Sequence, residues 1–201
     1  WELIGNFMYT RADYLTLVRT PSYVLNCAGM TAMTFALGGV SYWKPKYIHL
    51  YRGVPNLGQV NLIFGALTVL SGLSATLLGG LAGDRLSKRW PGAYFLVSGA
   101  GMLLGFPCFL LVLVTPFPWA WVWIFLAEFC LFFNTGPSNT ILANVTQPSV
   151  RATAFALNIF IIHAFGDAIS PPAIGWLNDH YNMRTAFMVM SLMILIGGVL
   201  W

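Results

Sequence analysis

Long apolar runs separated by short polar segments form the dominant pattern along the chain. Six runs reach the roughly 20 residues that a helix needs to cross a hydrocarbon layer about 30 Å thick, at a rise of about 1.5 Å per residue. They extend over residues 22–43, 58–82, 93–114, 119–145, 152–177 and 185–201. The sequence lacks the alternating ten-residue pieces that barrel strands require. The pattern therefore predicts an all-α membrane protein with six transmembrane helices.

The connectors between these runs are short and hold most of the charged residues. They read KPKYIHLYRGVPN, GDRLSKRWPG, TPFPW, TQPSVR and NDHYNMR, and the first four contain proline, which favours helix termination. Six crossings place both chain ends on one side of the membrane. That side has six basic residues, and the other side has four, Lys44, Lys46, Arg52 and Arg184. The positive-inside rule therefore favours cytoplasmic termini.

The two ends of the sequence predict a longer protein. Residues 1–20 mix apolar with charged positions, and we interpret them as a cytoplasmic linker or surface helix that precedes a helical bundle at residues 21–201. The chain begins without methionine or a signal peptide, and no polar residues follow the last apolar run. We therefore expect the bundle to pair with a part of the protein that this sequence does not contain.

Composition places the bundle in lipid. The 201 residues are 58% hydrophobic and 8% charged, with a mean hydropathy of +0.73, whereas soluble domains carry about 25% charged residues. The net charge of +4 is not gathered into a dense basic run, which argues against a nucleic-acid partner. Cys27, Cys108 and Cys130 lie in apolar runs without the spacing of metal ligands, so we expect no metal site.

Several polar side chains fall inside the apolar runs, where a charge costs at least about 2.5 kcal/mol. Asp167 and His163 are one helical turn apart on the same face, so we expect them to hydrogen-bond. We assign six side chains to a substrate or proton pathway: Glu128, Asn134, Asn158, His163, Asp167 and Ser170. The alternative is that they are polar contacts that join neighbouring helices.

Two runs contain helix-breaking residues beside polar ones. The segments NTGPSN (134–139) and GDAISPP (166–172) predict helix hinges at Gly136, Pro137, Pro171 and Pro172. Broken helices next to polar side chains are typical of transporters, although packing alone also produces kinks. The glycine-rich stretch GALTVLSGLSATLLGGLAG favours close helix packing.

Motifs of common enzymes are absent from the sequence. It contains no HExxH, GxSxG or phosphate-loop lysine motif, and no glycine-rich turn between a strand and a helix. His163 has no serine or metal-ligand partner at a spacing that suits a hydrolase. We therefore expect neither enzymatic activity nor a cofactor.

The segment GGLAGDRLSKR (79–89) resembles the G-x-x-x-D-R-x-G-R-R loop of the major facilitator superfamily, in the weaker copy between helices eight and nine. Ser87 stands where that motif has glycine. The resemblance implies helices 7–12 of that fold, the carboxy-terminal half, with an amino-terminal six-helix half as partner. It also implies a cytoplasmic gating loop, to which we assign Gly80, Asp84, Arg85, Lys88, Arg89 and, from the next cytoplasmic connector, Arg151.

The stretch RATAFALNIFIIHAFGDAISPPAIGWLND (151–179) resembles helix eleven of the Spinster family, and NTGPSNTILANV is similar to the preceding helix of its bacterial members. This resemblance implies a protein of the bacterial inner membrane and an amphipathic, lysolipid-like substrate, with protons as a candidate coupling ion.

We therefore predict a secondary transporter that works by alternating access on an amphipathic small molecule or lysolipid-like substrate. The alternative is a six-helix membrane scaffold or lipid-binding protein without transport. A channel would require a continuous polar stripe along several helices, whereas the polar residues cluster in the fourth and fifth runs.

Overall fold

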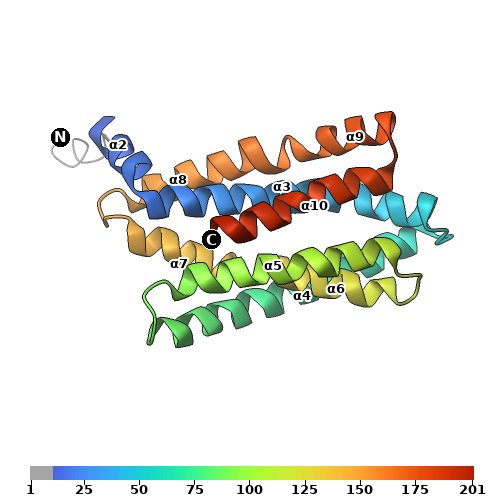
Figure 1. The fold of residues 1–201 in the computed structure, drawn as a ribbon, viewed down its shortest axis with the longest axis horizontal. Coiled ribbons are helices and arrows are strands. Elements are labelled where there is room, and N and C mark those ends of the chain that lie inside the picture. The colour runs from blue at the N-terminus through green and yellow to red at the C-terminus, as the bar shows by residue number, and fades with distance from the viewer. Residues whose placement is uncertain (1–10) are drawn as a thin grey trace.

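The computed structural model describes residues 11–201, with side chains from Tyr14 onward, and this part of the chain contains helices and no strand. Figure 1 shows the helices as a bundle of long, roughly antiparallel segments. In chain order they are α2 (Arg11–Arg19), α3 (Pro21–Tyr51), α4 (Leu57–Ser87), α5 (Ala93–Val114), α6 (Ala120–Phe132), α7 (Thr135–Val145), α8 (Arg151–Ile162), the π-helix η1 (His163–Asp167), α9 (Ser170–His180) and α10 (Met183–Leu200).

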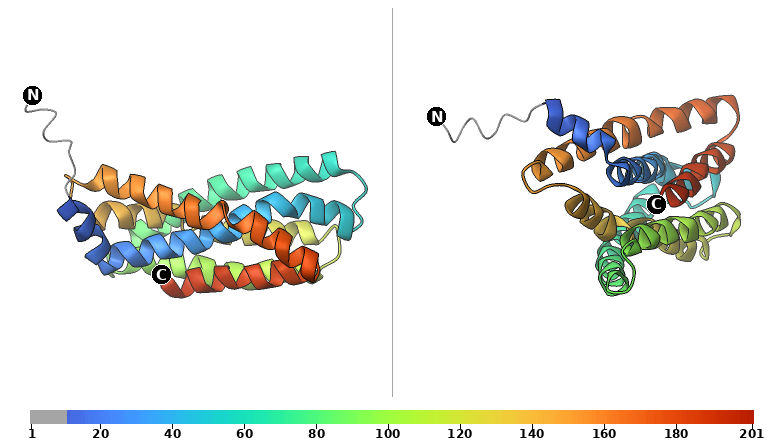
Figure 2. Two further views of the ribbon diagram at one scale, coloured as in Figure 1. Left: turned by 90° about the horizontal axis from the view of Figure 1, so that it is seen from above. Right: turned by 60° about the vertical axis from the view of Figure 1, so that its left-hand side comes forward.

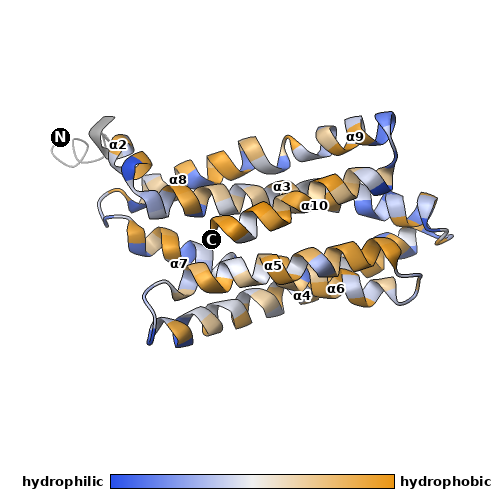
Figure 3. Ribbon diagram, in the orientation of Figure 1, coloured by the Kyte–Doolittle hydropathy of each residue, from blue (hydrophilic) through white to orange (hydrophobic). Residues whose placement is uncertain are grey.

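Six segments of the described chain are long and apolar enough to cross a membrane, which confirms the predicted fold class. The segments are α3, α4, α5, α6 with α7 (Ala120–Val145), α8 with η1 and α9 (Arg151–His180), and α10. Apolar residues cover most of their length, and polar ones gather at the two ends of the bundle (Figure 3). The same arrangement is seen from two other directions in Figure 2.

Helix α3 continues beyond the predicted end of the first run, so the interpretation of Lys44 as a connector residue is wrong. The helix passes through Pro45 and ends at Tyr51. Proline removes one backbone hydrogen bond, but Tyr47 and Ile48 beyond it are buried in the core, and this burial stabilises the extra helical turns. The connector shrinks to residues 52–56, in which Gly53 has a positive φ of 71°.

Two of the six spans are interrupted, as the proline and glycine pattern predicts. The fourth span breaks between α6 and α7, directly before Gly136 and Pro137. The fifth span changes to a π-helix at His163, earlier than the predicted break. Pro171 and Pro172 fall in the first turn of α9. Backbone N–H groups in the first turn have no partner within the helix, so proline costs no hydrogen bond there.

The connectors define two ends of the bundle (Figure 1). At the end that holds α2, residues 88–92 join α4 to α5 and residues 146–150 join α7 to α8. At the opposite end, which we call the distal end, three connectors lie together: residues 52–56, 115–119 and 181–182. Of the predicted linker at residues 1–20, residues 1–10 lie outside the described residues, and α2 packs on α3. Its assignment as a separate unit stays a prediction.

Candidate functional site

His163 and Asp167 form the predicted hydrogen-bonded pair. His163 Nδ1 lies 2.8 Å from Asp167 Oδ2, and 59% and 38% of the two side chains are exposed. Both residues belong to η1, the π-helical turn in the middle of the fifth span. Single π-helical turns inside α-helices occur frequently at functional sites. The pair therefore combines a titratable contact with an irregular backbone.

Helix α3 approaches η1 closely through glycine. A Cβ added to Gly38 would lie 2.7 Å from the Asp167 Cα and closer still to its Cβ. A Cβ added to Gly166 would lie 3.0 Å from the Thr34 Cβ. Because neither glycine has a side chain, α3 and η1 pack against each other without room for an added methyl group at either position.

Side chains of α3 also bind backbone oxygens of the irregular segment. Thr34 Oγ1 donates to the Ile162 carbonyl at 3.0 Å, and Trp43 Nε1 donates to the Pro171 carbonyl at 2.9 Å. Ser170 Oγ lies 3.5 Å from the Asp167 carbonyl. Backbone groups at a break need such partners because lipid offers none. Helix α3 thus stabilises the interruption from start to end.

A groove of about 330 Å³ lies where α3, η1 and the α6–α7 break meet. Its polar lining consists of Thr34, Ser41, Thr135 and Asp167, and the remainder is Met33, Leu37, Gly38 and Phe132. Of the six side chains assigned to a pathway, this groove contains Asp167, with its partner His163 adjacent. Although four of the lining residues are polar, almost all of the surface that faces the groove is apolar.

Glu128 forms a buried ion pair that the sequence analysis did not anticipate. Lys44 Nζ lies 3.6 Å from Glu128 Oε1, and about 4% of each side chain is exposed. Thr68 Oγ1 donates to Glu128 Oε2 at 3.1 Å, and Ser71 Oγ lies 3.5 Å from the same oxygen. The ammonium also lies 5.1 Å from the centre of the Phe64 ring. The carboxylate and the ammonium therefore compensate each other inside the bundle.

The ion pair is one helical turn from the groove. Ser41 precedes Lys44 by three residues, and Phe132 follows Glu128 by four, so the groove lining and the pair share two helices. Sequence reasoning missed Lys44 because it was placed in a connector, and it treated Thr68 and Ser71 as packing residues. The available signal was Glu128 itself, since a carboxylate in mid-span needs a cation nearby.

The other three side chains assigned to a pathway are buried. Asn134 Nδ2 donates to the Leu131 carbonyl at 2.7 Å, and Asn158 Nδ2 lies 3.5 Å from Met30 Sδ. The side-chain oxygens of both asparagines have no hydrogen-bond partner among the residues that the structure describes. Ser170 is also buried, beneath Asp167. In this conformation none of the three lines the groove, and their assignment stays a prediction.

The hinge residues of the fourth span pack against α4. A Cβ on Gly136 would lie 3.1 Å from the Gly80 Cα, and Pro137 is buried. A Cβ on Gly79 would clash with the carbonyl oxygen of Phe133, at the break itself. The glycines of α4 therefore serve the close packing that the sequence predicted, at the place where the fourth span is interrupted.

The residues assigned to a gating loop lie at the end of α4 and the start of α8. Asp84 Oδ1 accepts a hydrogen bond from Tyr94 OH at 2.9 Å and, within the part of the chain whose side chains are described, has no ion-pair partner. The four basic side chains of this assignment are exposed: Arg85, Lys88, Arg89 and Arg151. A charge network with Asp84 would require these side chains to move.

The chemistry available to the described residues is hydrogen bonding and proton transfer. Cys27, Cys108 and Cys130 are free thiols. Among residues 14–201 no group of three or more histidine, cysteine, aspartate or glutamate side chains is placed to hold a metal ion. The titratable groups of the described spans include those of the two ion pairs and these thiols.

Curated relatives of the chain carry the name spinster. The chain is 30% identical over 191 residues to the Arabidopsis thaliana "Probable sphingolipid transporter spinster homolog 3", covering 94% of this chain and 37% of that protein. It is 34% identical over 180 residues to "Protein spinster homolog 3" of Danio rerio, covering 83% of this chain and 36% of that protein. The chain therefore spans less than half the length of these relatives.

Solved structures show the same fold. The crystal structure of a bacterial homolog to the human lysosomal transporter Spinster, inward-facing and unoccupied, superposes with a TM-score of 0.79 at 14% identity, over 96% of this chain and 49% of that one. Its occupied form superposes with a TM-score of 0.74. The family model described as Major Facilitator Superfamily matches residues 8–166. Since this match covers most of the sequence, the chain belongs to the Major Facilitator Superfamily.

Proposed function

We propose that the chain is the carboxy-terminal six-helix half of a secondary transporter that works by alternating access. Its partner would be an amino-terminal six-helix half, and its substrate an amphipathic, lysolipid-like molecule. Protons are the proposed coupling ion. The spinster names of the relatives, one of them a probable sphingolipid transporter, support a lipid-like substrate class.

The observation that carries the proposal is the exposed His163–Asp167 pair in the middle of a span. A carboxylate at this depth is unfavourable against lipid, so it favours a position facing a water-filled cavity or another protein surface. The groove beside it presents a mostly apolar surface next to the titratable pair, an arrangement that suits an amphipathic molecule. A second half that covers this face would enclose a cavity with the titratable pair in its wall.

The interrupted spans support a mechanism in which helices bend. The α6–α7 break and η1 both adjoin the groove, so a change of shape at either one would alter its width. Gly136 and Pro137 would serve as one hinge, and Pro171 and Pro172 as the other. Loss of a proton from the His163–Asp167 pair would change the charge beside η1 and thereby favour one of two states.

The distribution of basic residues supports cytoplasmic termini in a bacterial inner membrane. With Lys44 buried in the core, the distal side retains three basic residues, Lys46, Arg52 and Arg184. The side of the termini has six: Arg11, Arg19, Arg85, Lys88, Arg89 and Arg151. The difference is larger than the sequence alone indicated, and the positive-inside rule places the larger group in the cytoplasm. The loop at Asp84 would then contact the partner half on that side.

The test is transport by the full-length protein in proteoliposomes, with a panel of lysolipids and amphipathic drugs and with or without an imposed pH gradient. We expect gradient-driven flux that is lost in Asp167→Asn, because the amide cannot exchange a proton. Asp179→Asn is the matched control: Asp179 is exposed on the same span but does not line the groove. It should transport at the original rate.

Two outcomes would contradict the proposal. Unchanged flux and an unchanged pH profile in Asp167→Asn would exclude the proton role. A correctly folded protein that moves none of the compounds would favour the alternative of a membrane scaffold or lipid-binding protein.

A further inference from the structure

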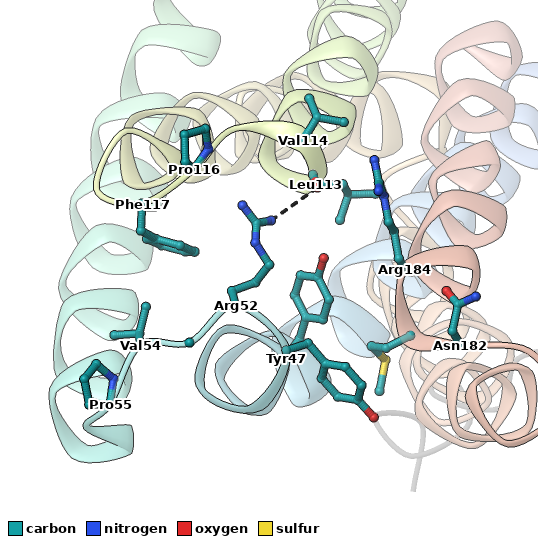
Figure 4. Close-up of a pocket in the computed structure, with 13 residues that line it drawn as sticks. Tyr47, Arg52, Val54, Pro55, Leu113, Val114, Pro116, Phe117, Asn182 and Arg184 are labelled. Carbon is teal, nitrogen blue, oxygen red and sulfur yellow. Dashed lines mark hydrogen bonds between the residues drawn. The ribbon is translucent and has the colours of Figure 1, made fainter.

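A second and larger pocket, of about 810 Å³, lies at the distal end of the bundle. Figure 4 shows it between the end of α3, the end of α5 and the start of α10. All three distal connectors contribute to its lining. It shares no residue with the groove beside Asp167, so it is separate from the proposed substrate pathway.

Arg52 is held in this pocket with a fixed orientation. Its Nη1 donates to the carbonyl oxygens of Val112 at 2.9 Å and Leu113 at 3.3 Å, and its Nη2 donates to that of Thr115. The guanidinium carbon also lies 5.4 Å from the centre of the Phe117 ring and 5.9 Å from that of Tyr47. These contacts use three of the five guanidinium hydrogens and leave two donors and a full positive charge for a ligand.

Arg184 supplies a second guanidinium to the same pocket. It is exposed in the first turn of α10, and no ion-pair or hydrogen-bond partner for it occurs among the described side chains. In Figure 4 the two arginines lie on either side of Leu113 and reach toward the end of α5. Tyr51 and Asn182 add further polar groups, and no acidic residue belongs to the lining that the structure describes. The described lining therefore holds two guanidiniums and no carboxylate, and only carbonyl oxygens contact the guanidinium of Arg52.

We propose that the distal pocket is a binding site for a phosphate group. A guanidinium presents parallel N–H groups that match two phosphate oxygens. Two guanidiniums without a nearby carboxylate favour an anion with several acceptor oxygens over a neutral molecule. The phosphate is carried by a lipid headgroup or by a soluble molecule. The exposed Val114 beside the pocket offers an apolar surface on which a lipid acyl chain would lie.

The experiment measures binding to the full-length protein in neutral detergent along two arms. One arm titrates phosphatidylglycerol and counts bound lipid by native mass spectrometry. The other arm titrates inorganic phosphate at constant ionic strength and follows binding by calorimetry. Arg184→Gln removes the free guanidinium and leaves the contacts of Arg52 in place. Arg184→Lys keeps the positive charge but lacks the two parallel N–H donors of a guanidinium. Arg19→Gln, an exposed arginine at the opposite end, is the matched control.

We expect saturable binding that is weakened about tenfold by Arg184→Gln, less by Arg184→Lys, and not by Arg19→Gln. Binding in the lipid arm alone identifies a headgroup as the ligand, and binding in both arms identifies the phosphate group itself. The proposal is overturned if neither arm saturates, or if Arg19→Gln weakens binding as much as Arg184→Gln does. Gel filtration and thermal unfolding of each variant establish that it is folded.

Discussion

Lys44 and Glu128 pair between two helices with about 4% of each side chain exposed, whereas His163 and Asp167 pair within one turn with 59% and 38% exposed. The first pair has two hydroxyl groups and an aromatic ring around it. Among the described residues, the side chains of the second pair form one hydrogen bond, which joins His163 to Asp167. The two pairs lie on the same bundle and differ chiefly in their access to water.

From this difference we predict different tasks for the two pairs. Removing two charges from water is costly, and their attraction offsets the cost only while both partners are present. The buried pair therefore fixes α3 against α6 and responds strongly to the loss of one member. An exposed pair of this kind contributes little to stability, and water can reach both of its members. A group that responds to a proton gradient needs the second environment.

The largest expected effect comes from Lys44→Met, which leaves Glu128 buried without its cation. We expect a loss of about 3–5 kcal/mol in the free energy of unfolding. The measurement is equilibrium unfolding in detergent micelles. The double variant Lys44→Met with Glu128→Leu removes both charges and should regain most of the loss. A single variant as stable as the original protein would show that the pair does not hold the helices together.

A smaller effect is expected for Gly38→Ala, at the contact between α3 and η1. The added methyl group would meet the backbone of Asp167, and we expect a loss of about 1–3 kcal/mol because two packed backbones must separate. Gly65→Ala on α4 is the matched control, since no atom lies within 4 Å of its added Cβ. It should be neutral or slightly stabilising. Equal melting temperatures for the two variants would contradict the close contact.

The smallest effect on stability is expected for Asp167→Asn. An exposed pair four residues apart on a helix contributes about 0.3–0.5 kcal/mol, so its unfolding curve should nearly overlay that of the original protein. Together with the predicted loss of gradient-driven transport, an unchanged unfolding curve would show that Asp167 acts in transport and not in stabilising the fold. A destabilisation as large as that of Lys44→Met would instead make the exposed pair a structural contact.

The sequence by itself determined the features that depend on local chemistry. The number of spans follows from the length of the apolar runs, and the breaks at Gly136 and before Pro171 follow from backbone constraints. The hydrogen bond between His163 and Asp167 follows from a four-residue spacing on one helix. In each case the interacting groups are neighbours along the chain.

Only the tertiary structure decided which distant groups meet. Helix α3 continues past Pro45 because Tyr47 and Ile48 are buried by other helices, and this burial takes Lys44 into the core beside Glu128. The arginines of the distal pocket likewise lie far apart in the sequence, Arg52 in the connector after α3 and Arg184 in the first turn of α10. Such contacts depend on how helices rotate and pack against each other, and the free energy of packing is a property of the whole bundle, which no local pattern records.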